Sequence, residues 1–261
     1  FYENAFNGEA FDFLNFKWIK DELRTPQKTT WASFAWTLIS EVEWATHFHN
    51  DARFGNTFPS PKGAEEGVQE RYWGGFLFSQ AFMQVLEWIE HPDLFEVQNP
   101  ASRYLVLFAL SQFTQLLTMG QVSHSITNRF TGIAELMTTI YFPNDNDIDL
   151  EEYLIHQMDS LYESLPEVNT PEEINIAIGS LVRYAFYNNY SLLGDEKKTR
   201  EILERLEKIT SNLLNLEAKT FIEKIHLLCA LLEANRITHK LVFLQRVIPL
   251  AQSFLENYES G

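Results

Sequence analysis

The stretch WASFAWTLISEVEWATHFHNDA, residues 31–52, decides the fold that this sequence predicts. Its apolar residues recur every three or four positions, which is the spacing of one face of an α-helix. That face is formed by Trp31, Ala35, Leu38, Val42 and Ala45. The end of the stretch adds a dense polar cluster of Glu41, Glu43, His47, His49 and Asp51. The sequence therefore predicts a long helix whose last turns carry the first candidates for chemistry.

The polar cluster divides between two sides of this helix. At about 100° per residue, the apolar face continues to His49, whereas Trp36, Glu43 and His47 fall on another side. His47 and Glu43 are either a surface pair at i,i+4 spacing or an acid–base pair or two metal ligands. His49 is either a core histidine bonded to a neighbouring carbonyl or a group that lines a pocket. If one residue of the cluster does chemistry, we expect it to be His49.

Helical spacing also predicts the elements on either side of this stretch. Residues 8–23 have the pattern of an amphipathic helix, and Thr29 or Thr30 is placed to cap the helix that follows. Residues 51–66 hold two prolines and two glycines, which predicts a long loop. The helical pattern resumes near Gly67 and ends at His91, before Pro92. Residues 101–117 then form a helix that is apolar almost all round and is therefore expected to be central.

The second half of the chain predicts further helices joined by short turns. The run Thr170-Pro171-Glu172-Glu173 is a helix start with proline at the first helical position. Residues 202–216 carry isoleucine and leucine at alternating spacings of four and three, which predicts a core-facing stripe. Pairs such as Glu201 and Arg205 are expected on its solvated outer face. Two more helices are expected over about 218–235 and 238–258.

These elements predict an all-α protein, because no segment alternates with period two for long. About ten helices are expected to pack as antiparallel hairpins, in an arrangement like helical repeats or an irregular bundle. We expect a single all-helical domain over residues 1–261, with any subdivision falling near residues 143–149.

Composition narrows the classes of partner and compartment. The chain has 261 residues and a net charge of −16, so nucleic acid and anionic membrane surfaces are not expected partners. Its longest apolar run is too short to cross a bilayer. Cys229 is the only cysteine and lies in the run HLLCALL, which predicts a buried, inert thiol. The lack of disulfides and of a visible signal peptide favours a cytoplasmic protein, with export after signal removal as the alternative.

A second group of candidate residues lies in the middle of the chain. Ser111 and Gln115 interrupt the apolar helix at i and i+4. The next helix, expected over about 121–140, places His124 and Asn128 on one side with Arg129 beside them. Such polar stripes on central helices either hydrogen-bond across a helix pair or line a ligand pocket. Convergence of His49 and His124 in space would favour a pocket.

No motif indicates a metal site or a particular cofactor. Aromatic residues make up 14% of the chain, which is typical of thick helix contacts or an aromatic-lined pocket. The sequence therefore favours a binding or interaction protein with an aromatic-lined cavity or groove for a small molecule or peptide. The alternative is an enzyme in which His49 and His124, with Glu43 or His47, perform acid–base or metal chemistry under a lid formed by residues 51–66. The candidate ligand-binding residues are Trp36, Ser111, Gln115, Asn128 and Arg129.

Overall fold

The computed structural model describes residues 9–12, 17–20, 28–51, 80–82, 84–85, 87–89, 91–118, 150–190 and 194–259. Within these ranges the chain is all-α, as the sequence predicts, with eight helices rather than about ten. Packing divides the chain into two compact units. The first comprises Phe1–Ser102 and Ala109–Ser160, and the second comprises Arg103–Phe108 and Leu161–Gly261. A single domain over the whole chain stays a prediction.

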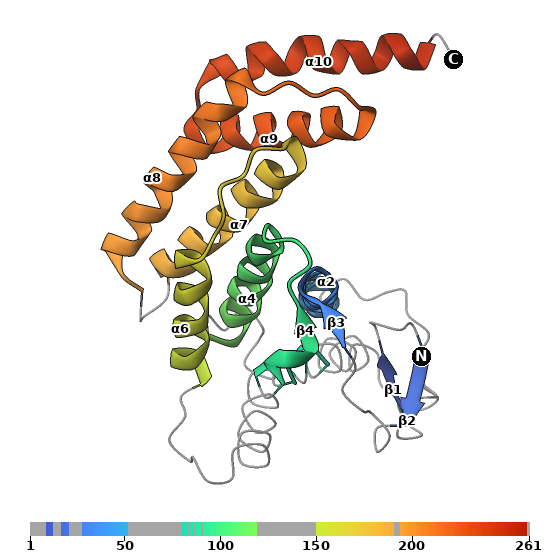
Figure 1. Cartoon of the computed structure of the whole chain (residues 1–261), viewed down its shortest axis with the longest axis vertical. Coiled ribbons are helices and arrows are strands. Elements are labelled where there is room, and N and C mark those ends of the chain that lie inside the picture. The colour runs from blue at the N-terminus through green and yellow to red at the C-terminus, as the bar shows by residue number, and fades with distance from the viewer. Residues whose placement is uncertain are drawn as a thin grey trace. The chain divides into compact units, whose positions relative to one another are not determined.

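The first unit is organised around helix α2, Trp31–Asp51, and the helical residues among 80–89 (Figure 1). The backbone N–H of Ser33 donates to Thr30 Oγ1 at 3.1 Å, so Thr30 caps the helix as expected. The predicted apolar face is buried at Ala35, Leu38, Val42 and Ala45. The long opening stretch is therefore a helix with one face in the core, as its spacing predicts.

A buried aromatic cluster joins α2 to the segment around residue 90. The rings of Phe34 and Trp88 stack at 5.8 Å, and Phe95 meets Phe34 edge-on at 5.2 Å. Trp31 Nε1 donates to the carbonyl of Phe95 at 2.9 Å, which satisfies its one polar group. Some of the aromatic residues of the chain are thus core residues that pack on one another.

The prediction of a helix over residues 8–23 is wrong, because the described residues in this range form two strands. Strand β1, Glu9–Asp12, pairs antiparallel with β2, Lys17–Lys20. The register places Glu9 opposite Lys20 and Asp12 opposite Lys17. Opposite charges facing each other across an antiparallel pair stabilise it, and helical spacing within one segment cannot reveal that pairing. A second small sheet pairs β3, Thr29–Thr30, in parallel with β4, Phe95–Glu96, which follows the 3-10 helix η2, Pro92–Leu94.

Helix α4, Ser102–Thr118, is buried on every side that the structure describes, as its apolar circumference predicts. In the part that belongs to the second unit, Tyr104 donates its hydroxyl hydrogen to the carbonyl of Pro166 at 2.9 Å. Ser180 Oγ donates to the carbonyl of Tyr104 at 2.6 Å. Helix α6, Leu150–Glu163, follows later in the chain.

The second unit holds four long helices in a row (Figure 1). They are α7, Pro171–Tyr190; α8, Glu196–Asn212; α9, Phe221–Thr238; and α10, Leu241–Glu259. Helix α7 contacts α8 and α9, and α9 also contacts α10. Helix α7 begins where the sequence predicts, since the Glu173 N–H donates to Thr170 Oγ1 at 3.2 Å. The predicted stripe is buried at Ile202, Leu206, Ile209 and Leu213. Its last member, Leu216, is half-buried and lies beyond the end of α8.

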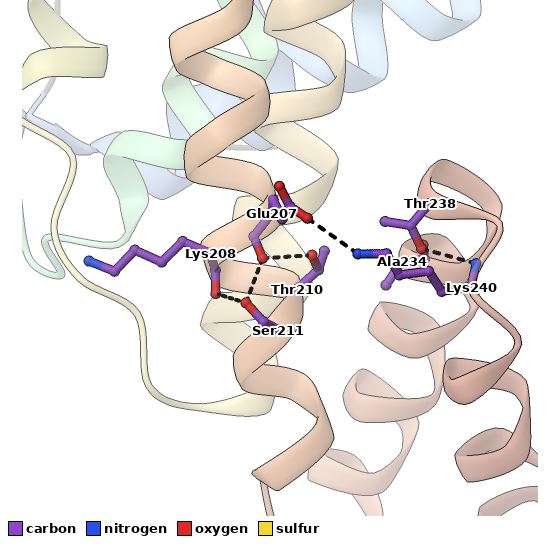
Figure 2. A network of polar contacts seen from close by, with 7 residues as sticks. All are labelled: Glu207, Lys208, Thr210, Ser211, Ala234, Thr238 and Lys240. Carbon is purple, nitrogen blue, oxygen red and sulfur yellow. Dashed lines mark hydrogen bonds and ion pairs between the residues drawn. The ribbon is translucent and has the colours of Figure 1, made fainter.

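A tight turn joins α9 to α10 and touches α8. His239 adopts the left-handed conformation with φ of 54°, which is a common way to end a helix. The Lys240 N–H donates to Thr238 Oγ1 at 3.3 Å, and Lys240 Nζ lies 3.2 Å from Glu207 Oε1 on α8 (Figure 2). The turn and its ion pair therefore tie the final helix pair to α8.

Arg205 corrects one expectation about the outer face of α8. Glu201 pairs with Lys197 at 3.6 Å, and the guanidinium of Arg205 instead donates to the carbonyls of Tyr162 at 3.3 Å and Leu165 at 2.8 Å. It also donates to the Tyr104 hydroxyl at 3.3 Å and lies 5.4 Å from the centre of the Tyr162 ring. Arg205 thus closes the end of α6 through carbonyls that lie far from it in sequence.

Candidate functional site

Several predicted site residues lie where the structure gives no side-chain description. His47 and His49 are in the last turns of α2, but only their backbone is described. His124, Asn128 and Arg129 lie outside the described residues, as does nearly all of the proposed lid. The shared site of His49 and His124, and the enzyme that depends on it, stay predictions. In the described part of the chain, no group of three or more His, Cys, Asp or Glu side chains could hold a metal ion.

The other predicted residues differ in burial. Trp36 and Glu43 are exposed on α2, with 54% of Trp36 accessible, whereas Ser111 and Gln115 are buried in α4. Ser111 Oγ lies 3.5 Å from Met158 Sδ, within the first unit. Their role in ligand binding stays a prediction.

Two glutamates of α2 are held by glutamine amides. Gln84 Nε2 donates to the buried Glu41 Oε1 at 2.8 Å, and Gln112 Nε2 on α4 donates to Glu43 Oε1. The expected partner of Glu43 was His47, so Gln112 is a partner that spacing along one helix could not indicate. Each amide thus supplies a donor to one oxygen of its carboxylate.

A concave site lies in the second unit, among residues that the structure describes. It has a volume of about 430 Å³ and lies between the loop before α9, the first half of α9 and the middle of α10. Its apolar wall is formed by Ala218, Leu227, Pro249 and Leu250. Its polar wall is formed by Glu217, Lys219, Lys224, Arg246 and Ser253. An apolar wall facing several cations is the composition of a site for an anion with an apolar part.

The start of α9 positions one side of this pocket. Thr220 and Glu223 form a capping box, in which the Glu223 N–H donates to Thr220 Oγ1 at 3.1 Å. The backbone N–H groups of Lys219 and Thr220 donate to Glu223 Oε2 at 2.7 and 2.8 Å. These backbone donors lower the pKa of the Glu223 carboxyl, so it is ionised at neutral pH. The box therefore fixes the backbone of Lys219 at the mouth of the pocket.

Arg246 positions the opposite side. Its guanidinium donates to the carbonyl of Leu213, the first residue of the 3-10 helix η3, Leu213–Asn215, and to that of Leu216, the residue that follows it. Burial lowers the pKa of Arg246, and the charge of Glu217 opposes that change. The contact ties the loop that carries Glu217 and Ala218 to α10, so three separate segments are held around one hollow.

The charge of this region differs from that of the chain. Between residues 217 and 255 there are five basic and three acidic residues, although the whole chain carries a net charge of −16. Neither Lys219 nor Lys224 has an ion-pair partner among the described residues. The excess of basic residues is visible in the sequence, but the approach of Lys219, Lys224 and Arg246 is a product of the fold.

Comparison with known proteins adds no assignment to this geometry. The chain matches no protein-family model, no curated protein and no solved structure. Among the described residues, no helix has both the length and the apolar character needed to cross a bilayer.

Proposed function

We propose that the protein is a binding protein whose pocket between α9 and α10 holds an amphipathic anion. The observation that carries this proposal is the placement of Lys219, Lys224 and Arg246 around an apolar wall. The ligand would present a carboxylate to the cations and an apolar group to Leu227 and Leu250. A fatty acid and the end of an apolar peptide share this chemistry.

Electrostatics support an anion over a neutral ligand. The guanidinium of Arg246 already donates to two carbonyls, so it would attract an anion by electrostatics at a distance and not by a direct hydrogen bond. The ammonium groups of Lys219 and Lys224 remain to contact a carboxylate directly, at the mouth of the pocket. The carboxylate of Glu217 would repel an anionic ligand, but the charge of Arg246 acts on Glu217 and offsets this repulsion. Three cations and one acid line the pocket, and the ionised Glu223 lies outside the lining beside Lys219, so the lining itself carries an excess of positive charge.

The size of the pocket limits the ligand. A volume of about 430 Å³ falls at the small end of the range for ligand pockets, roughly 300 to 1,000 Å³. The pocket accommodates one short aliphatic chain or two peptide side chains. The peptide form would leave most of the partner outside, and decanoate would lie along the apolar residues with one side open to solvent.

The test is calorimetric titration of the protein with decanoate, with decanol, and with a short peptide that ends in a leucine carboxylate. We expect decanoate or the peptide to bind. Decanol lacks the carboxylate that the lysines would contact, so it should bind at least tenfold more weakly, a difference of about 1.4 kcal/mol in binding free energy. The stronger of the two carboxylates identifies the source of the ligand. Replacing both lysines, Lys219→Gln and Lys224→Gln, should reduce binding of that carboxylate by a similar factor.

Lys208→Gln is the matched control. Lys208 is exposed on α8, pairs with Glu167 at 3.8 Å and does not line the pocket. Circular dichroism should show the same helical content for all three proteins. Equal affinity for decanoate and decanol, or equal losses in the double variant and in Lys208→Gln, would contradict the proposal.

A further inference from the structure

Helix α9 has two opposite apolar faces, and only one of them is buried. The buried face consists of Leu227, Ala230, Leu231 and Ala234. The opposite face consists of Ile222, Ile225, Cys229 and Leu232, and we call it the outer stripe. At about 100° per residue, the two faces lie on opposite sides of the helix. Isolated exposed apolar side chains are common, but a continuous stripe along a helix marks a binding surface.

Cys229 lies in the middle of the outer stripe. The sequence predicts a buried thiol there, but the structure shows Cys229 exposed, so that prediction is wrong. The sequence around Cys229 would be equally apolar if the thiol were buried within the chain. What differs is that neither α7 nor α10 covers this side of α9.

We propose that a second copy of this chain covers the outer stripe, with its own α9 running antiparallel across a two-fold axis near Cys229. The spacing of the stripe, three, four and three residues, is that of a seam between two helices. Ile222 and Ile225 lie seven and four residues before Cys229, and Leu232 and the exposed Arg236 lie three and seven residues after it, so the stripe is nearly symmetric about Cys229. A two-fold contact requires such a self-complementary surface, because each half must fit the other.

Charge favours the second copy on this surface. His226 and Glu233 lie on the same side of the stripe, three residues before and four residues after Cys229. An antiparallel copy places each His226 beside the Glu233 of the other chain. Glu233 is also paired with Arg236 in its own chain, so its carboxylate is held in place.

The local charge of the helix pair removes the main obstacle to self-association. The chain carries a net charge of −16, which opposes contact between most of its surfaces. The segment from residue 217 to residue 255 has more basic than acidic residues, so two copies meet here without that repulsion. A helix of 18 residues is about 27 Å long, so the seam is short and the dimer is expected to be weak.

The first test is sedimentation equilibrium of the full chain under reducing conditions, from about 1 to 500 µM. We expect the mass to rise from 30.4 kDa towards twice that value as concentration increases. The double variant Ile225→Ser and Leu232→Ser should stay monomeric over the whole range. Leu203→Ser is the matched control, because Leu203 on α8 is 47% exposed and Leu232 is 45% exposed. This control should dimerise like the unchanged protein.

The second test uses the position of Cys229. Diamide oxidises two thiols to a disulfide, takes up their two hydrogens and becomes a hydrazine. Two Cys229 residues at a two-fold axis lie within disulfide reach, so covalent dimer should form rapidly and should disappear in the Ile225→Ser, Leu232→Ser variant. Monomeric mass at 500 µM, or a rate of cross-linking that the double variant leaves unchanged, would overturn the proposal. Decanoate binding tests a different surface, so failure of either proposal leaves the other standing.

Discussion

Helix α4 is apolar almost all round and helix α9 has two opposite apolar faces, yet the structure covers them differently. Leu105, Val106, Leu110 and Phe113 of α4 are buried, and even the polar residues Ser111 and Gln115 are enclosed. Helix α9 buries one face and exposes the opposite one. An apolar circumference therefore predicts that a helix will be covered, but it does not say by what. For α4 the cover belongs to the same chain, and for α9 we propose a second copy.

The largest effect is expected from truncating a side chain on each of these two helices. Leu110→Ala removes a fully buried side chain of α4, and we expect it to lower the free energy of unfolding by about 2 to 5 kcal/mol. Leu232→Ala removes a half-exposed side chain of α9, so we expect a loss below about 1 kcal/mol in the dilute monomer. Urea denaturation at low micromolar concentration measures both.

The same pair of variants distinguishes covered from uncovered surface at high concentration. If a second copy covers the outer stripe, the cost of Leu232→Ala should grow as protein concentration rises, and that of Leu110→Ala should not. A cost for Leu232→Ala that equals that of Leu110→Ala in dilute solution would mean that α9 is covered within one chain. The comparison between the two helices would then fail.

The next effect concerns Arg205, which contacts Tyr104 of α4 and carbonyls at the end of α6. Arg205→Ala removes charge-assisted hydrogen bonds to carbonyls, so we expect a loss of about 2 kcal/mol in stability. Burial raises the pKa of Tyr104, and Arg205 opposes that rise. The variant should therefore raise the pKa of Tyr104 further, which ultraviolet titration of the folded protein detects.

Arg200→Ala is the control for Arg205→Ala. Arg200 lies on the same helix and makes an exposed pair with Glu196 at 3.5 Å. Exposed pairs contribute little, so its removal should change stability by less than about 0.5 kcal/mol. Equal losses in the two variants would show that Arg205 acts only as a surface charge.

Local signals in the sequence predict the helices well, because caps and stripes depend on neighbouring residues. Thr30 starts α2, Thr170 and Glu173 start α7, and the leucine and isoleucine stripe of α8 is buried. The strands β1 and β2 are missed because their pairing brings together charges on two separate segments, Glu9 with Lys20 and Asp12 with Lys17. The exposure of Cys229 is missed because an apolar sequence does not show which side of a helix another helix covers.

The candidate site is harder to predict than the fold. The pocket cations come from the loop before α9, from α9 and from α10, so their approach depends on how these helices pack. The predicted site around His49 and His124 depends in the same way on tertiary packing. The sequence shows a basic segment in an acidic chain, but it does not show that Lys219 and Arg246 share one hollow.

A smaller effect is expected at the turn that ends α9. His239 has a φ of 54°, a conformation that costs a residue with a side chain about 1 kcal/mol. His239→Gly should therefore raise the free energy of unfolding by up to about 1 kcal/mol, as measured by urea denaturation. Gln245→Gly, inside α10, is the opposite control and should lower it by about 1 kcal/mol. Destabilisation by His239→Gly would show that the imidazole makes contacts that outweigh the backbone strain.

The smallest effect is expected at the start of α9, where Glu223 closes the capping box. Backbone donors lower the pKa of its carboxyl in the folded protein, so the unfolded chain binds a proton at a higher pH than the folded one. The stability that Glu223 contributes is therefore complete above its unfolded pKa and is lost as pH falls through its lowered folded pKa. Glu223→Gln should be less stable than the unchanged protein at pH 7, and the difference should shrink below about pH 4. Thermal unfolding between pH 3 and 7 measures this, and a difference that does not depend on pH would show that the box acts without its charge.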